Sequence, residues 1–377
     1  MKKLKKLINL FLTYFLDLPS RMKDMINPAL YLTRLRIIKV FQNKEENSKI
    51  IFIYVIFQKA NIPFYVKNVL DCLEKMNVVI HIVANGNTSE DSISYLKSKS
   101  HKLILRKNIG KDFGGYKDGI MLANLEGFEK LFILNDSMFY FNKNLSNFFR
   151  ELINKRADYI CLNENYQHHY HAQSFLLGFS RNIFRSKFFK NFWKFYLPLN
   201  SRLHTIHKGE VGLTSLLLKN GYTPFCFNNL YELRKKLLGL TIDNLNKVLE
   251  EVFFSNRMNS DFSYLQNHLA TRLLFKIFIG PEDSSKIHFI NSLIELLSEH
   301  NPTHACGFLF AKLFNRPCIK RDIYYRRAFN FVSIQSALDE LKYSKNEISE
   351  TMDELKIKGQ GSCLPFLKKL HYNLGLL

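Results

Sequence analysis

Short apolar runs alternate with longer amphipathic stretches between residues 50 and 140 of the chain. Apolar runs at 50–57, 78–85, 102–108 and 130–140 predict strands, and the first two are continuous enough to be buried on both faces. Helices are predicted between them, over 64–76, 88–99 and 116–127. This order predicts an α/β fold with a mostly parallel sheet flanked by helices. Ligands of such sheets bind outside the carboxyl ends of the strands.

The pattern becomes helical after residue 230, with predicted helices over 240–254, 287–300 and 333–355. A polar linker at 43–49 separates the first strand from an apolar and basic beginning. We therefore divide the chain into an amphipathic N-terminal segment of helices (1–45), an α/β core (46–230) and a mainly helical C-terminal region (231–377).

The N-terminal segment combines lysines at positions 2, 3, 5 and 6 with apolar side chains at helical spacing from Leu4 to Leu18. This pattern is typical of a helix that lies on an anionic membrane surface. The alternative is a helix packed on the protein's own core. The apolar run is about half of the roughly 20 residues that span a bilayer, and no small-residue cleavage site follows it. We expect neither a transmembrane span nor a signal peptide.

The chain carries a formal net charge of +21. Such an excess attracts nucleic acid, an acidic membrane leaflet or phosphate-bearing substrates, or else consists of solvated lysines that aid solubility. The six cysteines show neither a CxxC pair nor metal-ligand spacing, which indicates buried thiols in a reducing compartment. Because no nucleic-acid recognition motif accompanies the charge, we expect no nucleic-acid partner.

A glycine-rich stretch follows the third predicted strand. It lacks the spacing of a Walker loop and of GxGxxG. Gly110, Gly114 and Gly115 would let backbone N–H groups approach a diphosphate, and Lys111 or Lys117 would offset its charge. The alternative is a purely structural glycine-rich turn.

Three further groups of residues carry candidate chemistry. Asn135, Asp136 and Ser137 follow an apolar run, where a carboxylate can hold a divalent ion or a sugar hydroxyl or can simply cap a turn. The histidines at 168, 169 and 171 have a spacing that permits metal binding but more often serves hydrogen bonding. Glu210 begins an amphipathic helix, where it can deprotonate a hydroxyl or cap the helix.

Five stretches taken together are more specific than any one of them: NIGKDFGGYKDGI (108–120), LFILNDSMFY (131–140), HAQSFLLGFS (171–180), GEVGL…GY (209–222) and NPTHACGFLFAKLFNRPCIKRDI (301–323). In this order they resemble the rhamnan synthesis F family of bacterial polysaccharide glycosyltransferases. The resemblance implies a GT-A-like nucleotide-sugar-binding core and transfer of a sugar, in the name-giving members L-rhamnose, to a lipid-linked glycan. The C-terminal region would complete the acceptor side.

The resemblance also implies roles for individual residues. Glu210 matches the usual place of the catalytic base. The implied donor-binding residues are Asn108, Gly110, Lys111, Asp112, Gly114, Gly115, Lys117, Asn135, Asp136, Ser137, Gln173 and Gly178. The residues implied for acceptor or phosphate are His171, His304, Lys320 and Arg321. The usual Asp-x-Asp motif, which holds Mg²⁺ or Mn²⁺, reads Asn-Asp-Ser here. Asp136 is its only acid, so metal dependence stays open.

The leading hypothesis is an inverting glycosyltransferase peripheral to the cytoplasmic face of the bacterial inner membrane, with dTDP-rhamnose or a similar donor. It would act in the synthesis of O-antigen, capsule or rhamnan. The alternative is a non-catalytic nucleotide-sugar or glycan-binding subunit of an assembly complex.

Overall fold

The structure is a computed structural model that describes residues 2–58, 61–166, 169–241, 244–245, 248, 282–299, 301–364 and 366–374. Its central sheet has the strand order β1 (Ile37–Gln42), β4 (Lys102–Arg106), β3 (Val79–Asn85), β2 (Ile50–Ile56), β5 (Lys130–Asn135), β9 (Leu176–Ser180), β7 (Tyr159–Asn165) and β10 (Phe225–Asn228). The strands β4, β3, β2 and β5 are parallel, as are β7 and β10. Antiparallel pairs join β1 to β4, β9 to its two neighbours, and β8 (His171–Ala172) to β7. The predicted α/β fold with a largely parallel sheet is confirmed.

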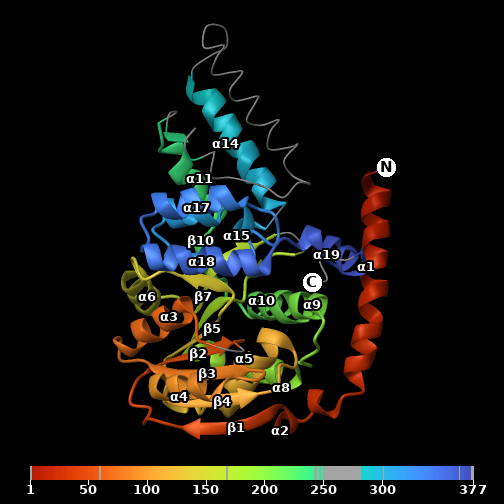
Figure 1. Cartoon of the computed structure of the whole chain (residues 1–377), viewed down its shortest axis with the longest axis vertical. Helices are drawn as coiled ribbons and strands as arrows, with labels where there is room; N and C mark the ends of the chain where they lie inside the picture. The colour runs from red at the N-terminus through yellow and green to blue at the C-terminus, as the bar shows by residue number, and fades with distance from the viewer. Residues whose placement is uncertain are drawn as a thin grey trace.

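Two hydrophobic cores cover the two faces of this sheet, because successive side chains of a strand point to opposite sides. Phe52 and Tyr54 of β2 face one core, whereas Ile51 and Ile53 face the other. Helices that pack in the first core are α3 (Phe64–Glu74), α4 (Glu90–Lys99), α6 (Leu145–Asn154), α17 (Phe331–Glu340) and α18 (Lys345–Lys358). Helices that pack in the second are α5 (Lys111–Leu122), α7 (Arg181–Phe184), α8 (Lys187–Phe195) and α10 (Val211–Lys219). Figure 1 shows where these helices lie around the sheet.

The glycines of the 108–120 stretch bring α5 unusually close to the sheet. A Cβ atom on Gly115 would lie 2.6 Å from Val55 Cγ1, and one on Gly119 would lie 2.6 Å from Ile53 Cγ2. Only glycine fits at such distances without displacing the strand. This helix begins at Lys111, five residues before the predicted start of 116.

Two other predicted elements are divided by turns. The predicted strand 130–140 is β5 followed by β6 (Met138–Tyr140), because the chain turns at Asp136 and Ser137. The predicted helix 333–355 is two helices, since Ser344 and Glu347 form a capping box that starts α18. Most of the predicted helix 240–254 lies outside the described residues.

A third hydrophobic cluster joins the helices that follow β10. These are α11 (Leu230–Leu238), α14 (Glu282–Ser298), α15 (Pro302–Ala305) and α16 (Gly307–Leu313). The chain then forms β11 (Cys318–Lys320), which pairs with β6 in a separate two-stranded sheet. This pairing brings residues near 320 to the end of β5. A last helix, α19 (Phe366–Asn373), follows.

The N-terminal segment begins with α1 (Lys2–Met25), which Figure 1 shows upright along one side of the molecule. Short helices η1 (Pro28–Leu30) and α2 (Thr33–Arg36) lead into β1 at the sheet edge. Arg36 and Arg106 both donate hydrogen bonds to Asp118 of α5, and all three side chains are fully buried. This arginine clamp fixes the segment to α5. None of the helices described is both long and apolar enough to cross a membrane.

Candidate functional site

The candidate site lies where the chain reverses its direction across the sheet. From β2 the chain adds β3 and β4 on one side, then crosses through α5 to add β5 on the other side of β2. The carboxyl ends of β2 and β5 are therefore neighbours, with Val55 opposite Asn135. Open α/β sheets bind ligands outside the strand ends at such switch points.

Asp136 stands at the centre of this junction and is 6% exposed. Its Oδ2 accepts hydrogen bonds from Phe57 N (2.9 Å) and Gln58 Nε2, both beyond the end of β2. Its backbone carbonyl accepts one from Arg321, whose nearest guanidinium nitrogen is 3.9 Å from Oδ2. Glu354 holds the same guanidinium. The acid and a fixed cation thus stand side by side.

Asp112 belongs to the first turn of α5 and reaches the same strand ends. Its Oδ2 accepts a hydrogen bond from Asn135 Nδ2 at 3.0 Å. Burial raises the pKa of the Asp112 carboxyl to about 6, and the charge of Asp136 acts in the same direction. Its neighbour Lys111 is half-buried with φ +51°, and burial lowers the pKa of its ammonium.

Lys320 enters the site from the far end of the sequence. The pairing of β11 with β6 sets it opposite Met138. Its Nζ donates to Ser137 Oγ at 2.9 Å and lies 4.8 Å from the centroid of the Phe175 ring. Burial lowers the pKa of this ammonium, while the carboxylates of Asp322 and Asp112 act in the opposite direction. The lysine is thus a cation surrounded by acids.

Glu210 ends a π-helical turn, η3 (Thr205–Glu210), directly before α10. Its Oε1 accepts from Ser174 N at 3.0 Å and from Ser174 Oγ at 2.7 Å. Its Oε2 is 3.6 Å from Nε2 of His171, whose Nδ1 bonds His169 O at 2.7 Å. Because both donors of Ser174 hold one oxygen, the other is oriented toward His171.

The segment 301–322 closes the site from a further side. Gln173 donates to Asn301 Oδ1 at 3.3 Å and accepts from Thr303 Oγ1. His304 Nε2 lies 2.8 Å from Asp322 Oδ1. Burial alone would raise the pKa of Asp322, but His304 outweighs it and, with help from Lys320, holds this pKa far below its usual range.

Packing explains several of the residues predicted to bind the donor. Gly178 lies inside β9, where a Cβ would be 2.5 Å from Phe132 Cε1. A Cβ on Gly114 would be 2.1 Å from Ile109 O. Lys117 Nζ donates to Tyr196 O at 2.6 Å, and burial lowers the pKa of its ammonium to about 8.

The start of the glycine-rich stretch lies against the loop around Pro198. Gly110 has φ +78°, and a Cβ there would be 2.3 Å from Pro198 Cβ. Its N–H donates to Asn200 Oδ1 at 2.9 Å. Asn108 is exposed before it. In this structure the positions of Gly110 and Gly114 lie against protein atoms. The predicted contacts of this stretch with a diphosphate stay predictions.

Sequence reasoning overlooked Gln58 and Asp322, and it included Ser174 only within the range 173–178 expected under the donor sugar. Gln58 follows the end of β2, so the rule that points to Asp136 could also have found it. Ser174 and Asp322 stand inside the conspicuous stretches 171–180 and 301–323, but nothing in the sequence pairs them with Glu210 and His304.

The residues at the junction do not fit a divalent cation well. Among the residues that the structure describes, no three His, Cys, Asp or Glu side chains gather as metal ligands. Asp136 Oδ2 is already hydrogen-bonded to two donors, and the ammonium of Lys320 bonds Ser137 beside it. The guanidinium of Arg321, 3.9 Å from Asp136 Oδ2, already supplies a positive charge next to the only acid of the Asn-Asp-Ser motif.

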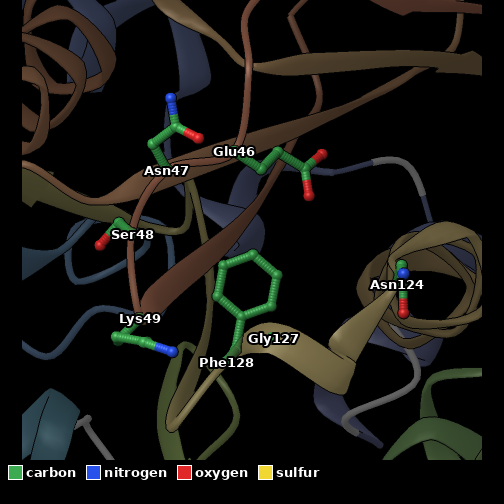
Figure 2. A pocket seen from close by; sticks show the side chains of 7 residues that line it. All are labelled: Glu46, Asn47, Ser48, Lys49, Asn124, Gly127 and Phe128. Atoms are coloured by element: carbon green, nitrogen blue, oxygen red, sulfur yellow. The ribbon is translucent and has the colours of Figure 1, made fainter.

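A pocket at the opposite edge of the sheet is unrelated to this junction. Figure 2 shows its lining residues, which precede β2 and β5 or follow α5: Glu46, Asn47, Ser48, Lys49, Asn124, Gly127 and Phe128. It therefore lies at the amino ends of these strands, away from the candidate site.

Comparison of the sequence with known families gives a match to rhamnan synthesis protein F over residues 80–278. The chain belongs to this family of glycosyltransferase-like proteins. In this rhamnan synthesis F family member, the matched residues 80–278 include Asp112, Asp136 and Glu210. Lys320 and Arg321 lie downstream of the matched range.

Individual relatives are distant. The uncharacterized protein y4gN of Sinorhizobium fredii is 26% identical over 190 residues, which are 48% of this chain and 49% of that protein. The chain thus spans about half the length of this curated relative. A predicted nucleotide-diphospho-sugar transferase from Desulfovibrio desulfuricans has 11% identity and a TM-score of 0.30, covering 46% of this chain and 78% of that one. The mannosyltransferase PcManGT from Pyrobaculum calidifontis, solved with GDP-Man and Mn²⁺, has 10% identity and a TM-score of 0.29, covering 81% and 85%.

Proposed function

We propose that this protein transfers a sugar from a nucleotide-diphosphate donor, dTDP-rhamnose or similar, to a lipid-linked glycan of a bacterial cell-surface polysaccharide. The family assignment supports sugar transfer. The observation that carries the proposal is the convergence of Asp112, Asp136 and Lys320 at the switch point of the sheet, the usual ligand site of such folds. A lipid-linked acceptor would bring the enzyme to the cytoplasmic face of the inner membrane.

In this proposal Glu210 is the general base of an inverting reaction. The acceptor hydroxyl oxygen bonds to the anomeric carbon while the bond from that carbon to the diphosphate oxygen breaks, and Glu210 takes the hydroxyl proton. Ser174 holds Oε1, which leaves Oε2 to receive the proton. The nucleoside diphosphate leaves with the bonding electron pair.

The departing diphosphate needs positive charge, which Lys320 and Arg321 supply in this proposal. Both are already fixed, Lys320 by Ser137 and Arg321 by Asp136 and Glu354. Asp112 would accept a hydrogen bond from a sugar hydroxyl. Because the donor set does not fit Mg²⁺ or Mn²⁺, no step depends on a metal.

The test is a transfer assay with a panel of nucleotide sugars and Glu210→Gln as the diagnostic variant. We expect donor binding within about threefold of wild type and a loss of transfer of about 10²–10⁴-fold, the usual contribution of a general base. The matched control is Glu126→Gln, an exposed glutamate of η2 (Leu125–Gly127). Full transfer by Glu210→Gln would remove it as the base.

The Asn-Asp-Ser motif favours a second candidate, a non-catalytic nucleotide-sugar or glycan-binding subunit. Nucleotide-sugar binding without turnover by the wild-type chain, across the whole donor panel, would support this alternative instead.

A further inference from the structure

The helix α1 attaches to the protein through its polar side. Asp17 is 6% exposed and accepts from Ser201 Oγ at 2.7 Å. Two helical turns further along α1, Asp24 accepts hydrogen bonds from Asn200 N at 2.8 Å and from Asn200 Nδ2 at 3.2 Å. Thr13, also buried, lies on the same side at helical spacing. Hydrogen bonds of these polar side chains thus hold the described part of α1 against the protein.

The apolar side of α1 faces solvent. Its outer face consists of Phe11, Phe15, Leu18, Met22 and Met25, spaced four, three, four and three residues apart. Their exposed fractions run from 51% for Met25 to 70% for Phe11. This arrangement is the inverse of an ordinary surface helix, whose apolar stripe packs on the core. A continuous exposed apolar stripe marks an interaction surface.

The exposed apolar surface continues beyond α1. Ile26, Tyr31 and Leu32 are exposed in the segment that leads to β1. The helix that carries the stripe runs along the outer side of the molecule, as Figure 1 shows. A helix of 24 residues is about 36 Å long, so a broad, flat partner fits it better than a small ligand does.

The charge around the stripe selects the partner. Residues 1–40 contain nine lysines and arginines but only two aspartates, and both aspartates bond to the protein side of α1. The outward side of α1, over the residues whose side chains are described, is thus apolar, and it belongs to a segment whose charge is strongly positive even though Arg36 is buried on Asp118 and Arg21 pairs with Asp17. That combination matches an anionic lipid surface, which receives apolar side chains below its headgroups and attracts lysines from outside.

We infer that α1 is a membrane-docking helix that lies in the surface of an anionic bilayer with its outer face inserted. The biological setting rests on the proposed function, but docking itself needs neither donor nor acceptor. Asn200 bonds both Asp24 of α1 and the backbone N–H of Gly110, the residue directly before α5. One loop therefore connects the docked helix to the helix that carries Asp112.

The experiment is co-sedimentation of the full chain with vesicles of phosphatidylcholine and phosphatidylglycerol, and with vesicles of phosphatidylcholine alone. We expect binding to the anionic vesicles that weakens at least tenfold between low and high salt. The triple variant Phe11→Ser, Phe15→Ser, Met22→Ser should bind at least tenfold more weakly. The matched control makes three apolar-to-serine changes elsewhere on the exposed surface: Phe195→Ser, Tyr231→Ser and Val332→Ser.

Several results would overturn the inference. These are failure of the wild-type chain to bind anionic vesicles, equal loss in the triple and control variants, or a dimer in solution that the triple variant converts to a monomer. The last result would assign the face to a second copy of the chain. Circular dichroism checks that each variant folds. Glu210→Gln should still bind vesicles, so loss of transfer and loss of docking are separate outcomes.

Discussion

At the residue scale, the junction of β2 and β5 is a small set of opposite charges removed from water together. Asp136 lies 3.9 Å from Arg321, the charges of Asp112 and Lys320 act on each other, and hydrogen bonds to Asn135 and Ser137 fix Asp112 and Lys320 in position. Fixed charges in a partly buried site act more strongly on a ligand than solvated ones, because little reorganisation is needed. Removal of one partner would leave the other charge partly buried and unpaired, which would destabilise the site.

Lys320→Ala tests whether a side chain takes the place of a metal. We expect the affinity for a nucleoside diphosphate such as dTDP, measured by calorimetry, to fall about 10- to 100-fold, since one charge-assisted contact is lost. EDTA should leave wild-type affinity and transfer unchanged. Lys219→Ala, on an exposed lysine at the end of α10, is the control. Restoration of EDTA-treated protein by Mn²⁺ would contradict this role.

Asp112→Asn tests the shifted carboxyl through stability. The folded-state pKa of Asp112 is about 6, above its unfolded value of 3.8, so the folded state binds the proton more tightly. The contribution of the Asp112 carboxyl to the free energy of unfolding is therefore fully present below pH 3.8 and is lost as the pH rises through 6. Relative to Asp112→Asn, the wild type should lose about 2 kcal/mol of unfolding free energy between pH 4 and pH 7. Urea unfolding at several pH values measures this, and parallel pH profiles would contradict it.

At the element scale, α5 determines the geometry of the site because it starts at the strand ends and packs directly on β2 and β3. Gly115 and Gly119 form the contact face toward Val55 and Ile53. A helix at ordinary distance would carry Asp112 away from Asn135, to which it is now hydrogen-bonded. The glycines therefore serve the site indirectly, by setting the depth at which the helix lies.

Gly115→Ala should destabilise the fold by about 1–3 kcal/mol, because the added methyl group overlaps Val55. The control is Gly127→Ala, where a Cβ would meet no atom within 4 Å. Thermal unfolding measures both variants. Equal stability of the two proteins would show that α5 can move outward at no cost.

The elements also show how far sequence reasoning extends. Continuous apolar runs predicted β2 and β3 because strands buried on both faces leave an unmistakable pattern. The edge strand β1 has mostly exposed or half-exposed side chains, so its pattern does not separate it from a basic amphipathic segment. Likewise, a row of glycines indicates close approach, but not whether the approaching group is a phosphate or Val55.

At the scale of the whole molecule, the candidate site depends on contacts between distant parts of the chain. Lys320 reaches Ser137 across 183 residues through the pairing of β11 with β6, which no local pattern announces. Asp136 and Glu210 could be proposed from their positions after a strand and before a helix. Their partners Arg321 and Ser174 required the tertiary structure.

The arginine clamp and β1 have a practical consequence for anyone who shortens this protein. A fragment beginning at residue 46 would retain the glycine-rich helix but lose Arg36 and the strand that pairs with 102–106. The backbone N–H and C=O groups of β4 that now pair with β1 would then lie at the sheet edge, where they could pair with another polypeptide. Trimming the chain to residues 46–377 would thus favour aggregation through this open edge over a smaller folded protein.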